Sequence, residues 1–455
     1  MPRKSYTRRQ FLRTAGLASF GLGALVAGCQ PKVVEVTKIV EKVVTQVPSK
    51  PEAATLRLAT LPFFIPRTQE LVYLYQAAHP EVEVEIEPIS GDFTQKMMTL
   101  VAGGTLQDVI WTGNGFIEQF VLEGVCPDMQ PYAEAMSPNP MDDVWEVMQG
   151  VSYWQGGLYM MPWALDIVIM YYNKTILADA GVPEPSPQGM TLDEFNNLTI
   201  ACTKDTNGDG EVDQWGTNLG VKWNAIFTSW IYGFGGRFYN DDETKVEINT
   251  PECVEAFTAM TDFWTKHKSG VPWGADVGGD PFNLGKCATN FTIRMLSKDY
   301  RTLGLDFDVC LPPIQPVKRA TGCGTMGFCV TTAAQKNGLD QQAWECAVTT
   351  VSPLCQKTWA RDYLIVPVIK SLQDDPVWRD LPGPPAHTDV FIDALECAHP
   401  IPSSKGLECG STYMGVQYTA IMDAFDNIVI AGMPVQQAMD AAAKEINDCM
   451  AEHAS

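Results

Sequence analysis

One segment carries oxygen-bearing side chains at the spacing of a calcium-binding loop. Residues 205–213, DTNGDGEVD, match the first nine positions of an EF-hand loop, with Gly210 at the sixth position for the sharp turn. The ligands would come from Asp205, Asn207, Asp209, Glu211 and Asp213. The twelfth position is Gly216 instead of the usual bidentate Glu, so a remote acid would have to complete the shell. The alternative is a solvated turn, since Asp, Asn and Gly favour turns without any metal.

Cys29 is the second residue whose surroundings indicate chemistry. The segment LVAGC at 25–29 resembles a bacterial lipobox, in which the cysteine is diacylated and becomes the first residue of the mature chain. TRRQFLR at 7–13 has the pattern of a twin-arginine export motif. The apolar run from Ala15 to Ala27 is shorter than the ~20 residues that a spanning helix needs. The sequence therefore predicts a signal peptide at 1–28 and a lipid-anchored protein on the outer face of the cytoplasmic membrane.

The charge balance excludes several kinds of partner. The chain has a formal net charge of −22, and loss of residues 1–28 would leave 27 basic against 54 acidic residues. An acidic surface argues against nucleic acid, whose phosphates need basic residues. It also argues against adsorption to anionic lipid, so the lipid on Cys29 must supply the membrane contact.

Thirteen cysteines fit an exported chain. The twelve beyond Cys29 are an even number, which permits a full set of disulfides with a pairing that the sequence does not define. The alternative is that many are buried small hydrophobic residues. No CxxC pair occurs and the five histidines are scattered, so no zinc or redox signature is present.

Alternation of strand and helix patterns indicates an α/β fold. Residues 29–54 are expected to form a lipid-anchored tether, either a stalk with Val every three or four residues or a disordered spacer. The globular part then predicts strands at 55–60, 82–86 and 108–111, with helices at about 68–78 and 92–102 between them. This order builds a mostly parallel sheet. No GxGxxG or GxxxxGK[ST] string is present, so no nucleotide-phosphate loop is expected.

Several segments, in order, resemble the family 1 extracellular solute-binding proteins, the maltose-binding-protein-like receptors of ABC importers. ELVYLYQAAHPEVEVEIEPISGDFTQKMMTLVAGGTLQDVIWTGN at 70–114 is similar to the opening of that family, although Gln107 replaces its usual Pro. GGLYMMPWALDIVIMYYNKTILADAGV at 156–182 resembles its most recognisable segment. TLDEF at 191–195, FNLGKCA at 282–288 and the C-terminal AFDNIVIAGMPVQQAMDAAAKEIND extend the likeness over nearly all of 55–450.

The resemblance implies two α/β lobes, a type II-like periplasmic-binding-protein fold with a hinge and a ligand cleft between the lobes. Residues 55–165 and 327–372 would form lobe one, and residues 166–326 and 373–455 lobe two. The implied function is capture of a carbohydrate and its delivery to a transmembrane permease, without catalysis and without a required cofactor. The alternatives are a non-sugar solute such as a polyamine, phosphodiester or peptide, a secreted carbohydrate-active enzyme, or a sensory role.

A sugar site needs aromatic side chains against the ring faces and polar side chains against the hydroxyls. The positions that match the family's ligand contacts are Trp111, Asn114, Trp163, Asp166, Trp223, Trp230 and Arg294. The first two follow a predicted strand, where ligands bind in open α/β sheets. For each tryptophan the alternative is a core position. Arg294 is expected at the surface or in an ion pair, and would indicate an anionic sugar if it faced the cleft.

Overall fold

The computed structural model describes residues 54–91, 93–402, 409 and 415–453. The chain divides into two compact units, 1–51 and 52–455, and the described residues all belong to the second. The predicted export motif, Cys29 and the tether therefore lie outside the described residues. None of the helices in the described part of the chain is both long and apolar enough to cross a membrane.

The first sheet contains the strands that the sequence predicts near the start of the globular part. Its order is β2 (Val82–Pro88), β1 (Ala54–Thr60), β3 (Val109–Gly113), β13 (Met326–Val330) and β6 (Met161–Pro162). β1 pairs in parallel with both β2 and β3, which confirms the predicted strand–helix alternation. Helices α2 (Ile65–Ala78) and α3 (Phe93–Ala102) make the connections, and α13 (Asp340–Val348) and α14 (Pro353–Asp362) contact α2.

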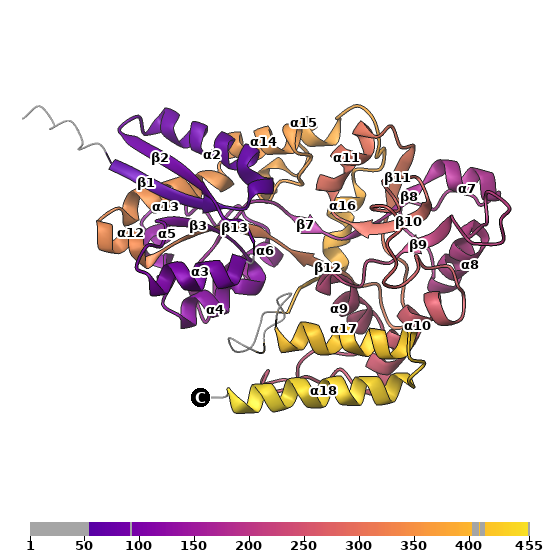
Figure 1. Ribbon diagram of the computed structural model, residues 1–455. Helices are drawn as coiled ribbons and strands as arrows, with labels where there is room; N and C mark the ends of the chain where they lie inside the picture. Colours follow the sequence, from indigo (N-terminus) through magenta and orange to yellow (C-terminus); the bar gives the residue numbers. More distant parts are fainter. Residues whose placement is uncertain (1–53, 92, 403–408, 410–414, 454–455) are drawn as a thin grey trace, which may run out of the picture. The chain divides into compact units, whose positions relative to one another are not determined.

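The second sheet has the order β11 (Phe307–Cys310), β8 (Ile169–Asn173), β10 (Cys287–Thr292), β9 (Trp215–Asn218). Around it lie α7 (Lys174–Ala180), α8 (Leu192–Cys202), α9 (Asn224–Gly233), α10 (Pro251–Thr265), α17 (Val416–Val429) and α18 (Val435–Glu452), with α17 and α18 packed side by side (Figure 1). Local sequence sets the bounds of α7: the Asn173 side chain accepts from the N–H of Ile176 at its start, and Gly181 adopts φ 68° at its end.

A small third sheet lies between the first two (Figure 1). Its order is β14 (Ala398–Pro400), β12 (Thr321–Gly324), β7 (Asp166–Ile167), so β7 and β14 form its opposite edges. α9 lies so close to β12 that a Cβ on Gly322 would stand 2.2 Å from the carbonyl oxygen of Ala225. We call these strands the crossing sheet, because the chain passes between the larger sheets through β7, from β6 to β8, and through β12, from β11 to β13. The lobe boundaries given above stay a prediction.

Shorter elements complete the described chain. They are η1 (Pro62–Phe64), η2 (Asn114–Phe116), α4 (Ile117–Leu122), α5 (Gln130–Glu134), α6 (Glu146–Ser152), β4 (Tyr153–Trp154), β5 (Gly157–Leu158), η3 (Arg294–Leu296), α11 (Ser297–Thr302), α12 (Thr332–Asn337), η4 (Thr349–Val351), η5 (Lys370–Leu372), α15 (Pro376–Arg379), α16 (Val390–Asp393) and η6 (Ala394–Cys397).

Two clusters of buried residues form the core. One follows the first sheet and reaches one face of the second sheet, and the other fills the space between the second sheet and helices α9, α10, α17 and α18. Of the twelve cysteines beyond Cys29, one pair, Cys409 and Cys449, forms a disulfide. The other ten are free and nine of them are buried, so the expectation of a full disulfide set is wrong and the buried alternative is confirmed.

Candidate functional site

Two parallel strands of the first sheet bring aromatic residues together where they end. β1 ends at Thr60 and leads into η1, while Trp111 lies near the end of β3. Because carboxyl ends of parallel strands share one edge, the rings of Phe64 and Trp111 stack with centroids 5.6 Å apart. The indole N–H of Trp111 is buried without a hydrogen-bond partner in the described structure. Phe63, which is 72 % exposed, adds an accessible aromatic face at this edge.

Trp163 lies between β6 and β7 and is fully buried. Its backbone N–H donates to the carbonyl of Met326, and its own carbonyl accepts from the Gln356 side chain. The edges or faces of Phe64, Phe328 and Trp359 surround its ring, with centroids between 4.7 and 6.0 Å away. The ring is therefore already covered in this conformation. What it still offers is the indole N–H, which has no hydrogen-bond partner among the described residues.

Asp166 is the first residue of β7 and is 7 % exposed. Its Oδ2 atom is buried and accepts no hydrogen bond from any described group. Burial raises the pKa of this carboxyl from 3.8 to about 6, and the guanidinium of Arg67 partly offsets the rise. The Trp163 indole N–H also lowers this pKa, although it approaches the carboxyl outside hydrogen-bond geometry. At neutral pH, Asp166 is therefore a desolvated carboxylate that can accept a hydrogen bond.

Arg67, in the first turn of α2, is the main residue that the sequence did not indicate. It is 3 % exposed, and burial lowers the pKa of its guanidinium to about 10. Its guanidinium carbon lies 4.5 Å from the ring centroid of Trp163 and 5.7 Å from that of Trp359. The hydrogen bond that the structure gives this side chain is a weak one, from Nη2 to the Sδ atom of Met295 at 2.8 Å. Its Nε–H is buried without a partner in the described chain.

We call this group the Asp166 cluster. It consists of Phe64, Arg67, Trp111, Trp163, Asp166 and Trp359. Five of its polar atoms are buried without a hydrogen-bond partner among the described residues: Arg67 Nε, Asp166 Oδ2 and the Nε1 atoms of Trp111, Trp163 and Trp359. A buried polar atom without a partner costs about 1–3 kcal/mol, so this concentration indicates a place for a polar ligand.

The expectation that Arg294 lies at the surface or in an ion pair is wrong. It is 2 % exposed, so it is not a surface residue, and no ion pair reaches it from the described chain. Its Nη1 and Nη2 groups donate to the carbonyl oxygens of Ile365 and Trp378, at 2.8 and 2.6 Å. These carbonyls belong to segments far away in sequence, so Arg294 links η3 to them. Sequence reasoning missed this because the partners are not local.

The remaining predicted ligand residues lie elsewhere. Trp230 is buried in the second core cluster, where its ring lies 6.1 Å from that of Phe234. Trp223 immediately precedes α9 and packs, half-buried, against the same cluster. Neither belongs to the Asp166 cluster. The backbone of Asn114 begins η2 at the end of β3, close to Trp111 in sequence, but its side chain lies outside the described residues.

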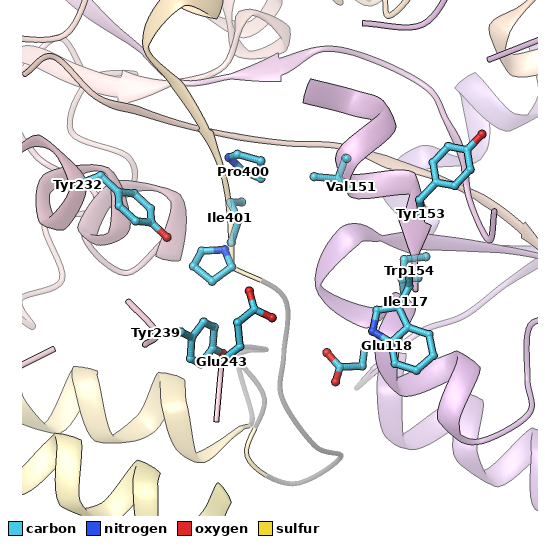
Figure 2. Close-up of a pocket in the computed structure, with 12 residues that line it drawn as sticks. Ile117, Glu118, Val151, Tyr153, Trp154, Tyr232, Tyr239, Glu243, Pro400 and Ile401 are labelled. Atoms are coloured by element: carbon cyan, nitrogen blue, oxygen red, sulfur yellow. The ribbon is translucent and has the colours of Figure 1, made fainter. Parts of the chain in front are cut away.

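A cavity of about 290 Å³ lies near the other edge of the crossing sheet (Figure 2). Tyr153 and Trp154 of β4 line one side, and Tyr232 and Tyr239 line the other (Figure 2). The residues that complete the lining are Ile117, Glu118, Gly150, Val151, Glu243, Pro400, Ile401 and Pro402. No predicted ligand residue is among these. Since Pro400 belongs to β14 and Asp166 to β7, the cavity and the Asp166 cluster lie at opposite edges of the crossing sheet.

The predicted calcium loop forms a series of turns. The two carboxylate oxygens of Asp205 accept from the backbone N–H groups of Gly208 and Gly210. Asn207 and Asp209 each accept from the residue two positions on, and Asp213 accepts from the backbone and hydroxyl of Thr206. These bonds agree with the turn alternative. Calcium binding at Asp205, Asn207, Asp209, Glu211 and Asp213 stays a prediction.

Two α/β lobes joined by a crossing sheet, with a buried polar and aromatic cluster where strands end, define the two-lobed class of solute-binding proteins. Residues 61–309 match the family of bacterial extracellular solute-binding proteins, and the chain belongs to that family.

Named relatives agree with this assignment. The maltotriose-binding protein of Pyrococcus abyssi is 24 % identical over 368 residues, covering 77 % of this chain and 72 % of that protein. A putative binding protein of Brucella abortus is 23 % identical over 303 residues, covering 65 % and 69 %. Among solved structures, an ABC substrate-binding protein of Listeria monocytogenes in complex with cycloalternan has a TM-score of 0.75 at 20 % identity, over 88 % of this chain and 99 % of that one. The sugar-binding protein MalE of Xanthomonas citri has a TM-score of 0.73 at 17 % identity, over 88 % and 98 %.

Proposed function

We propose that this protein is an extracytoplasmic carbohydrate receptor, which binds a sugar between its two lobes and delivers it to the permease of an ABC importer. The observation that carries the proposal is the Asp166 cluster, with five buried polar atoms that lack partners in the described structure. Relatives with names that specify a ligand bind maltotriose, mannitol and erythritol or L-threitol. All of these are polyhydroxylated.

The chemistry of a sugar suits this cluster. A sugar ring has apolar C–H faces and hydroxyl groups around its edge, each of which can donate and accept. Indole and guanidinium N–H groups would donate to the hydroxyl oxygens, and the Asp166 carboxylate would accept from a hydroxyl. Phe63 supplies an exposed apolar surface at the same edge of the sheet. Because these groups already exclude water, satisfying them by a ligand gains more than the same bonds would at the surface.

A thermal-shift panel on a soluble form that begins at Gln30 tests the proposal. Maltotriose, mannitol, galacturonate and spermidine represent neutral oligosaccharides, polyols, anionic sugars and polyamines. A bound compound at 100 times its dissociation constant should stabilise the protein by about 2.7 kcal/mol. A shift with a neutral sugar that is recovered chemically unchanged supports a receptor and argues against an enzyme. No shift with any sugar, or turnover of one, would overturn the proposal.

One observation favours a second candidate ligand. The cavity in Figure 2 combines four aromatic side chains with Glu118 and Glu243, a lining that would suit an organic cation. Spermidine in the panel represents this class. If spermidine alone stabilises the protein, and if Tyr232→Ala abolishes this effect while Asp166→Asn does not, the ligand site is that cavity and not the Asp166 cluster.

We also propose that Cys29 carries a lipid and that residues 1–28 direct export through the twin-arginine route. The support is the sequence pattern and the membership of a family of extracellular proteins. Metabolic labelling with a fatty acid should mark the full chain and not the Cys29→Ser variant. Equal labelling of both, or release of the wild-type protein into the medium, would contradict the lipid anchor. Replacement of both Arg8 and Arg9 by Lys should block export.

A further inference from the structure

We propose that Arg67 determines ligand specificity: with Asp166 it forms a donor–acceptor pair that selects a neutral ligand with adjacent hydroxyl groups. This inference rests on the proposed function and deepens it. It assigns a role to a residue that neither the sequence motifs nor the resemblance indicates, and it restricts the carbohydrate to an uncharged sugar or polyol.

The first observation is that Arg67 and Asp166 are close and opposite in charge but are not joined. The charge of Arg67 lowers the pKa of Asp166, yet no ion pair within 4.0 Å connects the two residues in the described structure. Each leaves a buried atom without a partner there, Nε of Arg67 and Oδ2 of Asp166. An ion pair that served only stability would be expected to close, because buried charges repay their desolvation only with direct contacts and further hydrogen bonds. A gap between two desolvated and complementary groups fits a group that enters from outside.

The second observation is that the guanidinium of Arg67 is fixed in place by rings and not by hydrogen bonds. Its carbon lies 4.5, 5.2, 5.7 and 5.7 Å from the ring centroids of Trp163, Tyr363, Phe64 and Trp359. A planar guanidinium that aromatic rings hold keeps its N–H donors available in a defined direction. Apart from the weak bond from Nη2 to Met295 Sδ, the Nε–H is buried without an acceptor among the described residues. The arrangement therefore pre-organises a donor at little cost in side-chain entropy on binding.

The third step is the choice of ligand class. A hydroxyl group can donate to Asp166 while its neighbour accepts from Arg67, so two adjacent hydroxyls satisfy both residues at once. A uronate or sugar phosphate would bring its charge close to Asp166, and an amine would bring its charge close to Arg67. Either would leave one buried charge facing a like charge. The pair therefore favours a neutral diol.

The experiment compares wild type, Arg67→Met and the matched control Arg57→Met by isothermal titration with maltotriose, mannitol, galacturonate and spermidine. Arg57 lies in β1 of the first sheet, and its guanidinium is partly exposed and pairs with Glu87. We expect a neutral probe to bind wild type, and Arg67→Met to weaken it about 10- to 100-fold, the range for a lost hydrogen bond to a charged group. Arg57→Met should change the affinity by less than about twofold.

The outcomes separate this inference from the proposed function. If neither neutral probe binds wild type, the proposed function fails as well. If a neutral probe binds wild type and Arg67→Met equally, the sugar receptor stands and the role of Arg67 is overturned. Binding of galacturonate or spermidine in preference to both neutral probes overturns the neutral-diol class.

Two further readouts distinguish ligand recognition from a packing role for Arg67. Among the described residues, the charged group that acts on Asp166 is Arg67, from α2. The other neighbours are uncharged: Gly324 of β12, which pairs with Asp166, and the indole of Trp163. Affinity for the neutral probe should fall as pH drops below about 6, because protonation removes the acceptor. In Arg67→Met the midpoint should move to higher pH, since the cation that lowers the pKa of Asp166 is gone. An unchanged midpoint would contradict the pairing.

The second readout is the melting temperature of the ligand-free protein at about pH 5, where Asp166 is mostly protonated. Arg67→Met then removes a buried cation that has no carboxylate partner, so the melting temperature should rise or stay unchanged. A clear fall in melting temperature, together with unchanged binding, would show that Arg67 serves packing alone and would overturn the proposal.

Discussion

Arg67 and Arg294 are equally buried, at 3 % and 2 % exposed, but they are held by different groups. Arg294 donates to two backbone carbonyls and its guanidinium lies near the rings of Trp378 and Phe391. Arg67 lies among aromatic rings and donates to a thioether. Each arginine also leaves its Nε–H without a partner in the described structure. Arg294 nevertheless links distant segments through two hydrogen bonds to carbonyl oxygens, whereas the acceptor that Arg67 reaches is a weak one.

The difference shows that burial alone does not identify a ligand-binding residue. Both arginines are buried charges, and the resemblance offered Arg294, through a loose match, as a ligand-binding candidate. What separates them is the kind of acceptor: the Nη groups of Arg294 donate to two backbone carbonyls, whereas the hydrogen bond of Arg67 in the described structure goes to a thioether. The same comparison separates two other buried residues. The indole N–H of Trp163 has no hydrogen-bond partner in the described part of the chain, whereas the carboxylate of Asp308 accepts from three backbone N–H groups and from the His387 side chain.

The largest effect is expected from the two buried tryptophans. Trp230→Ala should lower the free energy of unfolding by about 4 kcal/mol because it opens a cavity in the second core, while sugar affinity stays within about twofold. Trp163→Ala should also weaken sugar binding, by about 2 kcal/mol or more. Trp163→Phe keeps a ring and removes the N–H, so it should lose affinity with less loss of stability. Urea unfolding measures the free energy of unfolding, and titration calorimetry measures the sugar affinity. If Trp163→Ala weakens binding by less than about 0.5 kcal/mol, Trp163 does not belong to the ligand site.

Arg294→Met should lower the free energy of unfolding by about 3 kcal/mol, since the carbonyls of Ile365 and Trp378 would lose their donor. Arg67→Met, measured in parallel at about pH 5, should show no such loss. Denaturant midpoints of the two variants give the comparison directly. Equal destabilisation of both would remove the distinction between an arginine bonded to two carbonyls and one bonded to a thioether.

Asp166→Asn should stabilise the ligand-free protein by up to about 3 kcal/mol at about pH 8, because the folded state raises the pKa of this carboxyl from 3.8 to about 6 and ionised Asp166 is costly there. As pH falls through 6 the folded wild type takes up a proton, so the gain should shrink and vanish near pH 4. Sugar binding should weaken.

Asp308→Asn is the matched control, because Asp308 already has its partners. It should destabilise the protein instead. If Asp166→Asn also lowers the free energy of unfolding at about pH 8, the carboxylate of Asp166 has a structural partner.

The smallest effect is expected at the 205–213 loop. Its carboxylates already accept backbone N–H groups, as at Asp205, so calcium should change the melting temperature by no more than about 1–2 °C relative to EGTA. A larger rise, abolished by Asp205→Ala, would instead establish a structural calcium.

Local patterns in the sequence predicted much of the fold. Helix and strand periodicity placed the first three strands within about two residues, and β1, β2 and β3 pair in parallel as expected. Helix α2 begins at Ile65, three residues before the predicted start at Thr68, and this shift conceals Arg67 in a predicted loop.

The chemistry of the cluster depends on contacts that sequence spacing does not encode. Arg67 meets Trp359 and Tyr363, about 290 residues further along the chain. The folded chain is also needed to show that its Nε–H has no acceptor among the described residues. Arg294 was misjudged for the same reason, because its acceptors, Ile365 after α14 and Trp378 in α15, are remote in sequence. The cysteine pairing likewise joins residues that are 40 positions apart, Cys409 and Cys449.

The most direct test is a crystal structure with the sugar that gives the largest thermal shift. We predict that one hydroxyl of the sugar donates to Asp166 Oδ2 and that the adjacent hydroxyl accepts from Arg67. The indole N–H of Trp111 or Trp163 should also lie within hydrogen-bond distance of the sugar. Density for the sugar in the cavity between Trp154 and Tyr232, with the Asp166 cluster unchanged, would contradict it.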